Sequence, residues 1–216
     1  MIDRILTLRV LPKHRREFWP GLLAANVDLC KSFDSVNRDT LWRILSLRGV
    51  PPKLINLVSE LYSGTGSAGR CGDTISDLLA VVTGVRQGCV LAPTLFSTCM
   101  DWILRRMSER SSCSTSFGNV KISDLDFADD AVILWRLDIL LVALKVLNEE
   151  SEPLGFLESW VKTKICVFNG SLDAIIFSVP VCGEYVEVTK RFTFLGCDIY
   201  ISSDCEPQVN RHLGRT

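Results

Sequence analysis

The chain has 216 residues, 47% of them hydrophobic, and a formal net charge of −1 at pH 7. This size and composition suffice for one domain with a sizeable core, whereas no apolar run reaches the roughly 18 residues that a membrane-spanning helix needs. The sequence therefore predicts a globular domain with no membrane partner, and its balanced charge neither favours nor excludes a nucleic-acid partner.

The nine cysteines form no CxxC pair and only two histidines accompany them, which disfavours a zinc site. Cys30, Cys89, Cys99 and Cys166 lie in apolar segments, where a thiol is typical of a small buried side chain in a reducing compartment. Charged residues interrupt the first ten positions, so no secretory signal is predicted. We expect an intracellular location, in the nucleus, the cytoplasm or both.

Helical and strand-like patterns alternate along the chain. The helical segments, in chain order, are residues 2–10, 41–47, 53–62, 93–107 and 138–150. The strand-like segments are residues 21–30, a hairpin at 120–134, and residues 164–168, 174–178, 185–188 and 192–195. Residues 64–83 are rich in glycine and small side chains and predict turns with short strands. This order predicts an α+β fold with helices on one face of an antiparallel sheet.

Three aspartates stand out within this pattern. Asp129 and Asp130 are adjacent inside the apolar run 125–134, where two like charges cost free energy unless a cation offsets them. Asp28 ends another apolar run, so the predicted sheet brings it close to the pair. Carboxylates so placed suit Mg²⁺ or Mn²⁺, and two such ions about 4 Å apart serve nucleotidyl transfer. The alternatives are a strand-end or helix-cap aspartate for Asp28 and a hairpin turn for the pair.

Five segments resemble the motifs of reverse transcriptases, most closely those of non-LTR (LINE-type) retrotransposons. Residues 27–36, 84–93 and 127–130 resemble motifs A, B and C, and residues 155–164 and 194–196 are similar to motifs D and E. The resemblance implies a polymerase palm with partial fingers over residues 1–200, followed by a short C-terminal tail at 201–216.

The resemblance also implies an activity, namely RNA-directed DNA synthesis on an RNA template from a DNA primer and dNTPs. It assigns Asp28, Asp129 and Asp130 as catalytic ligands of two Mg²⁺ or Mn²⁺ ions. The substrate-binding residues that it implies are Phe33 beside the sugar, Arg86, Gln87 and Gly88 beside the nucleotide and the templating base, and Lys162 or Lys164 as the proton donor to pyrophosphate. A core position for Phe33 and solvated positions for Arg86 and the lysines are the alternatives.

The chain also departs from the family pattern. Asp28 comes almost at once, which leaves no room for the upstream fingers, and too few residues follow motif E for a thumb. A catalytically inactive retrotransposon remnant, or a captured nucleic-acid-binding module, is therefore the alternative function. An RNA-templated RNA polymerase is disfavoured by the aromatic residue Phe33.

Overall fold

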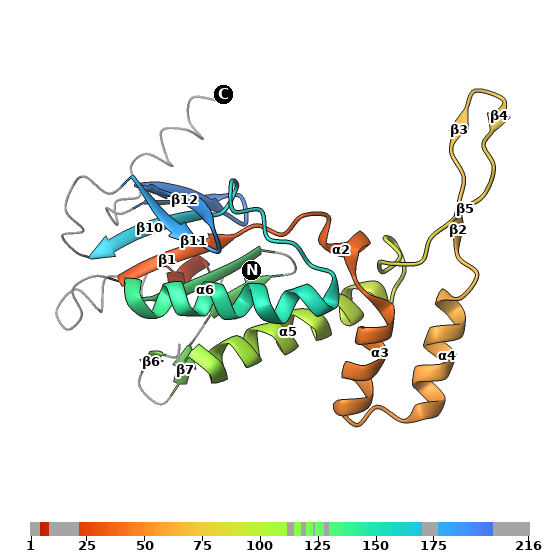
Figure 1. Ribbon diagram of the computed structural model, residues 1–216, viewed down its shortest axis with the longest axis horizontal. Helices are drawn as coiled ribbons and strands as arrows, with labels where there is room; N and C mark the ends of the chain where they lie inside the picture. The colour runs from red at the N-terminus through yellow and green to blue at the C-terminus, as the bar shows by residue number, and fades with distance from the viewer. Residues whose placement is uncertain are drawn as a thin grey trace.

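The computed structural model describes residues 5–8, 22–111, 115–117, 120–122, 124–127, 130–169 and 177–200. A six-stranded sheet with the strand order β11-β12-β10-β1-β9-β8 forms the centre of the domain (Figure 1). Its strands, in this order, are Ser178–Val181, Glu184–Thr189, Lys164–Asn169, Leu22–Val27, Asp130–Trp135 and Asp124–Phe127.

Strand β1 lies in the middle of this sheet, antiparallel to β9 on one side and to β10 on the other. Its side chains alternate between two hydrophobic clusters. Leu23, Ala25 and Val27 belong to the larger cluster, and Leu22 and Ala24 belong to the smaller one. An apolar run fits this position because a central strand is buried on both of its faces.

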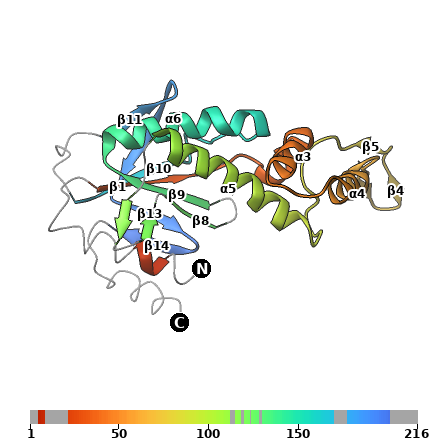
Figure 2. The ribbon, with the colours of Figure 1, turned by 90° about the horizontal axis from the view of Figure 1, so that it is seen from below.

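Two long helices, α5 (Ala92–Ser111) and α6 (Leu137–Ser151), cover one face of the sheet (Figure 2). The apolar side of α5 is buried at every position that its helical spacing predicts: Leu95, Phe96, Met100, Ile103, Leu104 and Met107. A hairpin of β13 (Arg191–Phe194) and β14 (Cys197–Tyr200) packs on the opposite face through Phe192, Phe194 and Ile199.

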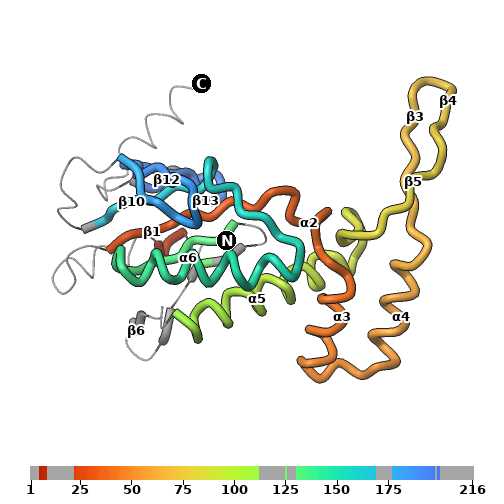
Figure 3. The backbone as a smooth tube through the Cα atoms, viewed as in Figure 1, coloured from red at the N-terminus to blue at the C-terminus, as the bar shows by residue number. Residues whose placement is uncertain are grey.

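The elements that follow β1 and precede α5 in the chain form a second group, which projects away from the sheet (Figure 3). It consists of helices α2 (Ser32–Ser35), α3 (Arg38–Leu47) and α4 (Pro52–Tyr62) and a long hairpin. The hairpin contains β2 (Gly66–Ser67), β3 (Arg70–Cys71), β4 (Thr74–Ile75) and β5 (Leu79–Ala80). Asn37 caps α3, since its side-chain oxygen accepts a hydrogen bond from the Thr40 amide at 3.0 Å.

The predicted α+β class, with helices on one face, is confirmed, and three details differ. Strand β12 runs parallel to β10, because the β11–β12 hairpin joins the sheet through its second strand. The sequence pattern predicted no strand at β6 (Thr115–Phe117), which pairs with β7 (Val120–Ile122) in a small hairpin. The sequence pattern also missed β14, where polar and apolar residues mix.

Several predictions fall on residues outside the described part of the chain. These are most of the first helix, of which residues 5–8 are helical, most of the strand at 174–178, and the tail at 201–216. Within the described ranges, no helix combines the length and hydropathy that crossing a membrane requires.

Candidate active site

Asp28 and Asp130 lie at adjoining ends of paired strands. In the β1–β9 ladder Val27 is opposite Ala131, so Asp28 follows the last pair and Asp130 precedes it. Residues opposite each other in such a ladder have Cα atoms about 4.5–5.5 Å apart. Asp129 is outside the described residues, and within them no group of three or more His, Cys, Asp or Glu side chains is arranged to hold a metal ion.

The backbone of Asp28 is fixed by the loop that precedes β10. The Asp28 amide donates to the Thr163 hydroxyl at 3.3 Å, and the Asp28 carbonyl accepts from the Ser159 amide at 2.8 Å. The next residue, Leu29, forms a β-bridge with Glu158. The sequence segment similar to motif D therefore supports the segment similar to motif A.

One carboxylate oxygen of Asp28 is left without a hydrogen-bond donor. The side chain as a whole is 40% exposed, yet its Oδ2 is inaccessible to solvent and accepts no hydrogen bond. Lys162 Nζ forms an ion pair with this oxygen at 3.7 Å, a distance too long for a hydrogen bond. A buried acceptor without a donor costs about 1–3 kcal/mol, and a bound cation removes that cost. The position and the donor type both fit a divalent cation.

Lys164 is placed differently from Lys162. Its ammonium group donates to the Glu187 carboxylate at 2.6 Å and to the Val161 carbonyl at 3.1 Å. Of the two lysines considered as proton donors, Lys162 is therefore the one beside Asp28.

The segment from Asp28 to Asn37 is held between two loops that are far apart in sequence. On one side, the Cys30 and Asn37 amides donate to the Leu157 and Leu154 carbonyls at 2.8 and 2.7 Å. On the other side, backbone amides of the loop 83–87 donate to the same segment: Gly84 to Val36 at 2.8 Å and Val85 to Phe33 at 2.7 Å.

A glycine makes the close approach possible on each side. A Cβ atom at Gly155 would lie 2.4 Å from the Ser35 carbonyl oxygen, and one at Gly84 would lie 2.8 Å from the Asp34 Cα atom. Both glycines also have a positive φ, 80° and 81°, which other residues adopt only with strain. The contacts between the segments similar to motifs A, B and D therefore depend on these two residues.

Phe33 lies in α2, five residues after Asp28, and is partly buried. Its ring stacks on the fully buried ring of Phe96, with centroids 4.5 Å apart and an interplanar angle of 15°. One face of Phe33 therefore packs on the core, and the ring keeps some exposure.

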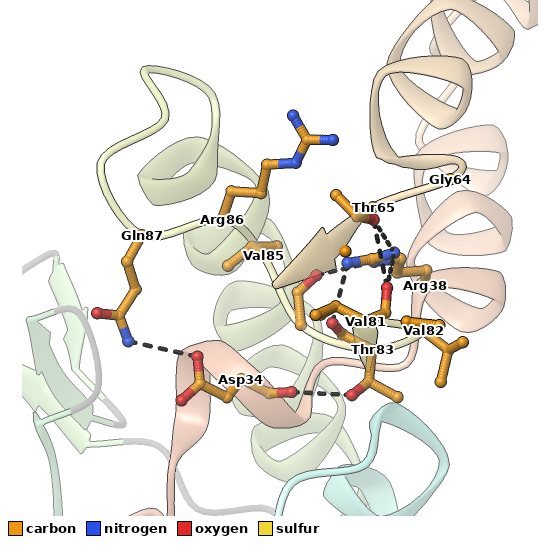
Figure 4. A pocket seen from close by; sticks show the side chains of 13 residues that line it. Asp34, Arg38, Gly64, Thr65, Val81, Val82, Thr83, Val85, Arg86 and Gln87 are labelled. Atoms are coloured by element: carbon orange, nitrogen blue, oxygen red, sulfur yellow. Dashed lines mark hydrogen bonds between the residues drawn. The ribbon is translucent and has the colours of Figure 1, made fainter. Parts of the chain in front are cut away.

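Gln87 and Arg86 point in different directions (Figure 4). The Gln87 side-chain amide donates to the Asp34 carboxylate at 3.3 Å. Arg86 donates to the Leu61 carbonyl at 2.6 Å and lies over the Tyr62 ring, 5.4 Å from its centroid. These contacts favour a structural role for Arg86 at the end of α4. Gly88 is exposed, and an added Cβ there would meet no atom within 4 Å.

A cavity of about 990 Å³ opens beside Gln87, between the base of the long hairpin and the loop 83–87 (Figure 4). Arg38 lies in its wall, and our sequence reasoning did not select this residue. A signal was present: Arg38 is the first residue of α3, where a positive charge opposes the helix dipole.

Two arginines of α5, Arg106 and Arg110, pair with acidic residues of α6. Arg110 donates to Glu150 at 2.6 Å and to Glu149 at 2.7 Å, and Arg106 also donates to Glu150. Burial opposes the charge of Glu150, but the hydrogen bonds from both arginines outweigh it and hold the pKa of Glu150 below its ordinary value. These arginines join α5 to α6.

Comparisons with known proteins agree with the geometry. Residues 16–199 match the family model described as reverse transcriptase (RNA-dependent DNA polymerase). The chain is 28% identical over 131 residues to the Pol polyprotein of the retrotransposable element R2DM of Drosophila melanogaster, and 34% identical over 129 residues to that of the R2 element of Nasonia vitripennis. It is 24% identical over 179 residues to the RNA-directed DNA polymerase from mobile element jockey of Drosophila funebris.

These alignments cover 61%, 59% and 79% of the chain, respectively, but only 12%, 12% and 19% of those relatives. Among solved structures, telomerase from Candida tropicalis in complex with a fragment of telomeric RNA matches with a TM-score of 0.63 and 16% identity. The match covers 93% of this chain and 32% of that one. At this identity the likeness concerns the fold alone, which is that of a polymerase palm.

Proposed function

Because the chain belongs to the reverse transcriptase (RNA-dependent DNA polymerase) family, we propose that it carries the catalytic palm of an RNA-directed DNA polymerase. The substrates are a DNA primer, an RNA template and dNTPs. The observation that carries this proposal is the placement of Asp28 and Asp130 at adjoining strand ends, with Oδ2 of Asp28 buried and lacking a donor. Asp129, next in sequence to Asp130, is proposed as the third carboxylate.

These three carboxylates would hold two Mg²⁺ or Mn²⁺ ions, since both ions prefer hard oxygen ligands. When bound, the ions lower the pKa of the primer 3′-hydroxyl and neutralise the charge of the leaving pyrophosphate. The protein must hold its ligands still, because misplacement by about 1 Å can slow such a reaction on the order of a hundredfold. The hydrogen bonds from Ser159 and to Thr163 supply this rigidity at Asp28.

Other side chains around Asp28 are assigned to the substrate. Lys162 is 70% exposed and close to Asp28, which suits a proton donor to the pyrophosphate. Phe33, held by its stacking on Phe96, fills the volume that a ribose 2′-hydroxyl would need. Gln87 is the last residue of the loop 83–87, which packs on α2, and Gly88 follows it; we assign both to the nascent base pair.

Single-nucleotide primer extension tests the proposal. The chain is incubated with poly(A)/oligo(dT), dTTP and Mg²⁺ or Mn²⁺, and we expect extension to fall at least about a hundredfold in Asp28→Asn and in Asp130→Asn. Asp138→Asn is the matched control: its carboxylate is 67% exposed near the start of α6, beyond the far end of β9 from Asp130.

Metal binding, measured by Mn²⁺ electron paramagnetic resonance, gives a second readout. Binding that is lost in Asp28→Asn, together with extension by the wild type alone, supports the proposal. Extension that persists in Asp28→Asn or Asp130→Asn contradicts the catalytic assignment. Metal binding without any extension by the wild type contradicts polymerase activity of this chain and favours the inactive remnant.

A further inference from the structure

Arg38 donates hydrogen bonds to five acceptors, all of them uncharged. Its guanidinium group also lies over the Tyr62 ring, 5.1 Å from the centroid. The acceptors are the carbonyl oxygens of Tyr62, Val81, Thr83 and Gly84 and the hydroxyl of Thr65, at 2.9–3.0 Å. Four of the five hydrogen bonds thus end on backbone carbonyl oxygens. Arg38 therefore fixes the position of the backbone at these residues.

The five acceptors come from three different segments, and Figure 4 labels three of the residues that supply them, Thr65, Val81 and Thr83. Tyr62 ends α4, Thr65 and Val81 form the base of the long hairpin, and Thr83 and Gly84 begin the loop that carries Gln87. Arg38 joins all three segments to the start of α3.

The same loop is held to α2 from its other side. The Thr83 hydroxyl donates to the Asp34 carbonyl at 3.1 Å, and Gln87 donates to the Asp34 carboxylate at 3.3 Å. Arg38 follows Asp34 by only four residues. The hydrogen bonds from Arg38 and those to Asp34 therefore attach the loop to the same short stretch of chain. The position of Gln87 relative to Asp34 is therefore determined by Arg38 and α2 together.

Partial burial of Arg38 opposes its positive charge. The pKa of Arg38 is lowered, chiefly by burial, and its place at the first position of α3 opposes the helix dipole as well. A neutral side chain would avoid both effects. The arrangement is understandable if the site requires a planar fork with N–H donors on three nitrogens, because no other side chain has that geometry.

We propose that Arg38 is a positioning residue that sets the loop 83–87, and with it Gln87, for the incoming nucleotide, and that it couples the long hairpin to the active site. The catalytic part of this inference rests on the proposed polymerase function. Arg38 acts through the loop, and none of these five hydrogen bonds leads to Asp28 or Asp130.

The test compares Arg38→Lys with the matched control Arg43→Lys, an exposed position on the same helix. Lysine keeps the charge but carries only three N–H donors on a single nitrogen, so it cannot bond all five acceptors. We expect the KM for dTTP in single-nucleotide extension to rise about tenfold or more in Arg38→Lys, with kcat changed less than threefold. Arg43→Lys should match the wild type in both constants.

Amide hydrogen exchange supplies a readout that does not depend on activity. In Arg38→Lys the Gly84 and Val85 amides should exchange at least about ten times faster, while the amides of β1 and β9 keep their wild-type rates. Equal acceleration throughout the sheet would show a general loss of stability and overturn the positioning role. Unchanged exchange in the loop would overturn it too.

The two readouts separate the two proposals. If the wild type extends no primer but loop exchange in Arg38→Lys accelerates, the polymerase proposal fails and the structural part of the Arg38 inference stands. If extension is robust and the KM of Arg38→Lys equals that of the wild type, the Arg38 inference fails alone. Arg38→Gln provides a second variant if the lysine form does not fold.

Discussion

A Cβ atom at Gly84 would lie 2.8 Å from the Cα atom of Asp34, closer than real Cβ contacts. Gly84→Ala should therefore separate the loop 83–87 from α2 or lower the free energy of unfolding. The left-handed φ of 81° alone costs about 1–2 kcal/mol in a residue with a side chain, and the clash adds to it. Urea denaturation measures the total loss.

Gly49→Ala is the control for this prediction. Gly49 has nearly the same φ, 82°, but an added Cβ would meet no atom within 4 Å. The loss in Gly84→Ala should exceed the loss in Gly49→Ala, and the difference isolates the close approach to Asp34. Equal losses of unfolding free energy in the two variants would mean that the loop relaxes freely. The close approach of Gly84 to Asp34 would then contribute nothing to stability.

Phe33→Ala is predicted to relax sugar selection. If the ring fills the space for a 2′-hydroxyl, the ratio of kcat/KM for dUTP to that for UTP should fall about 10- to 100-fold. The stacking contact with Phe96 is also lost, at a cost of about 1–3 kcal/mol for this partly buried ring.

Phe33→Tyr keeps the volume of the ring and should keep the discrimination between dUTP and UTP. An unchanged ratio in a folded Phe33→Ala protein would refute the sugar-selecting role and leave Phe33 as a core residue.

Divalent cations are predicted to stabilise the protein through the carboxylates at the strand ends. A ligand that binds only the folded state at a hundredfold excess over its Kd adds about 2.7 kcal/mol to the free energy of unfolding. The rise in Tm on addition of Mn²⁺ should disappear with EDTA and should be absent in Asp28→Asn. In the absence of metal, Asp28→Asn should be at least as stable as the wild type, because the neutral amide takes the place of a carboxylate with a buried oxygen that has no hydrogen-bond donor and does not repel the neighbouring Asp130 carboxylate. An equal Mn²⁺ response of the wild type and Asp28→Asn would place the ion elsewhere.

The ion pairs between α5 and α6 predict a pH-dependent stability. Glu150 is 11% exposed, and its pKa in the folded state lies below the ordinary value of 4.5. Its contribution is therefore fully present above about pH 4.5 and is lost as pH falls through the lowered pKa. Glu150→Gln should cost about 1–2 kcal/mol at pH 7 and much less near pH 3, measured by urea denaturation at both pH values.

Glu109→Gln is the control for Glu150→Gln. Glu109 pairs with Arg105 one helical turn away at 3.0 Å, and both side chains are mostly exposed. Such surface pairs contribute about 0.3–0.5 kcal/mol, so the control should change little at either pH. A loss in Glu150→Gln that is the same at pH 7 and pH 3 would contradict the role of its charge.

The sequence predicted those helices and strands whose own residues show a clear hydrophobic pattern. The apolar face of α5 repeats over five turns, and the run before Asp28 has the length of a buried strand, so both were found from sequence. The strand ends at Asp28 and Asp130 followed from the polar residues that interrupt apolar runs.

Features that depend on distant parts of the chain were not predicted. Strand β12 pairs in parallel with β10. The alternation of side chains within a strand does not specify which strand lies next to it or in which direction that strand runs. The acceptors of Arg38 are mostly backbone carbonyls, 24 to 46 residues away in sequence, and every residue type has a carbonyl. Only the unfavourable position of Arg38 in α3 hinted at an external partner.

The central place of β1 in the sheet has a consequence for biosynthesis. Its partners β9 and β10 follow about 100 and 140 residues later in the chain. At about 5–20 residues per second, the ribosome releases β1 roughly 5–20 s before β9 is complete. During that interval an apolar strand has neither of its edges paired, which is the state most prone to aggregation. Faster elongation or a chaperone that binds short apolar segments should therefore raise the soluble yield, and variants that slow translation between β1 and β9 should lower it.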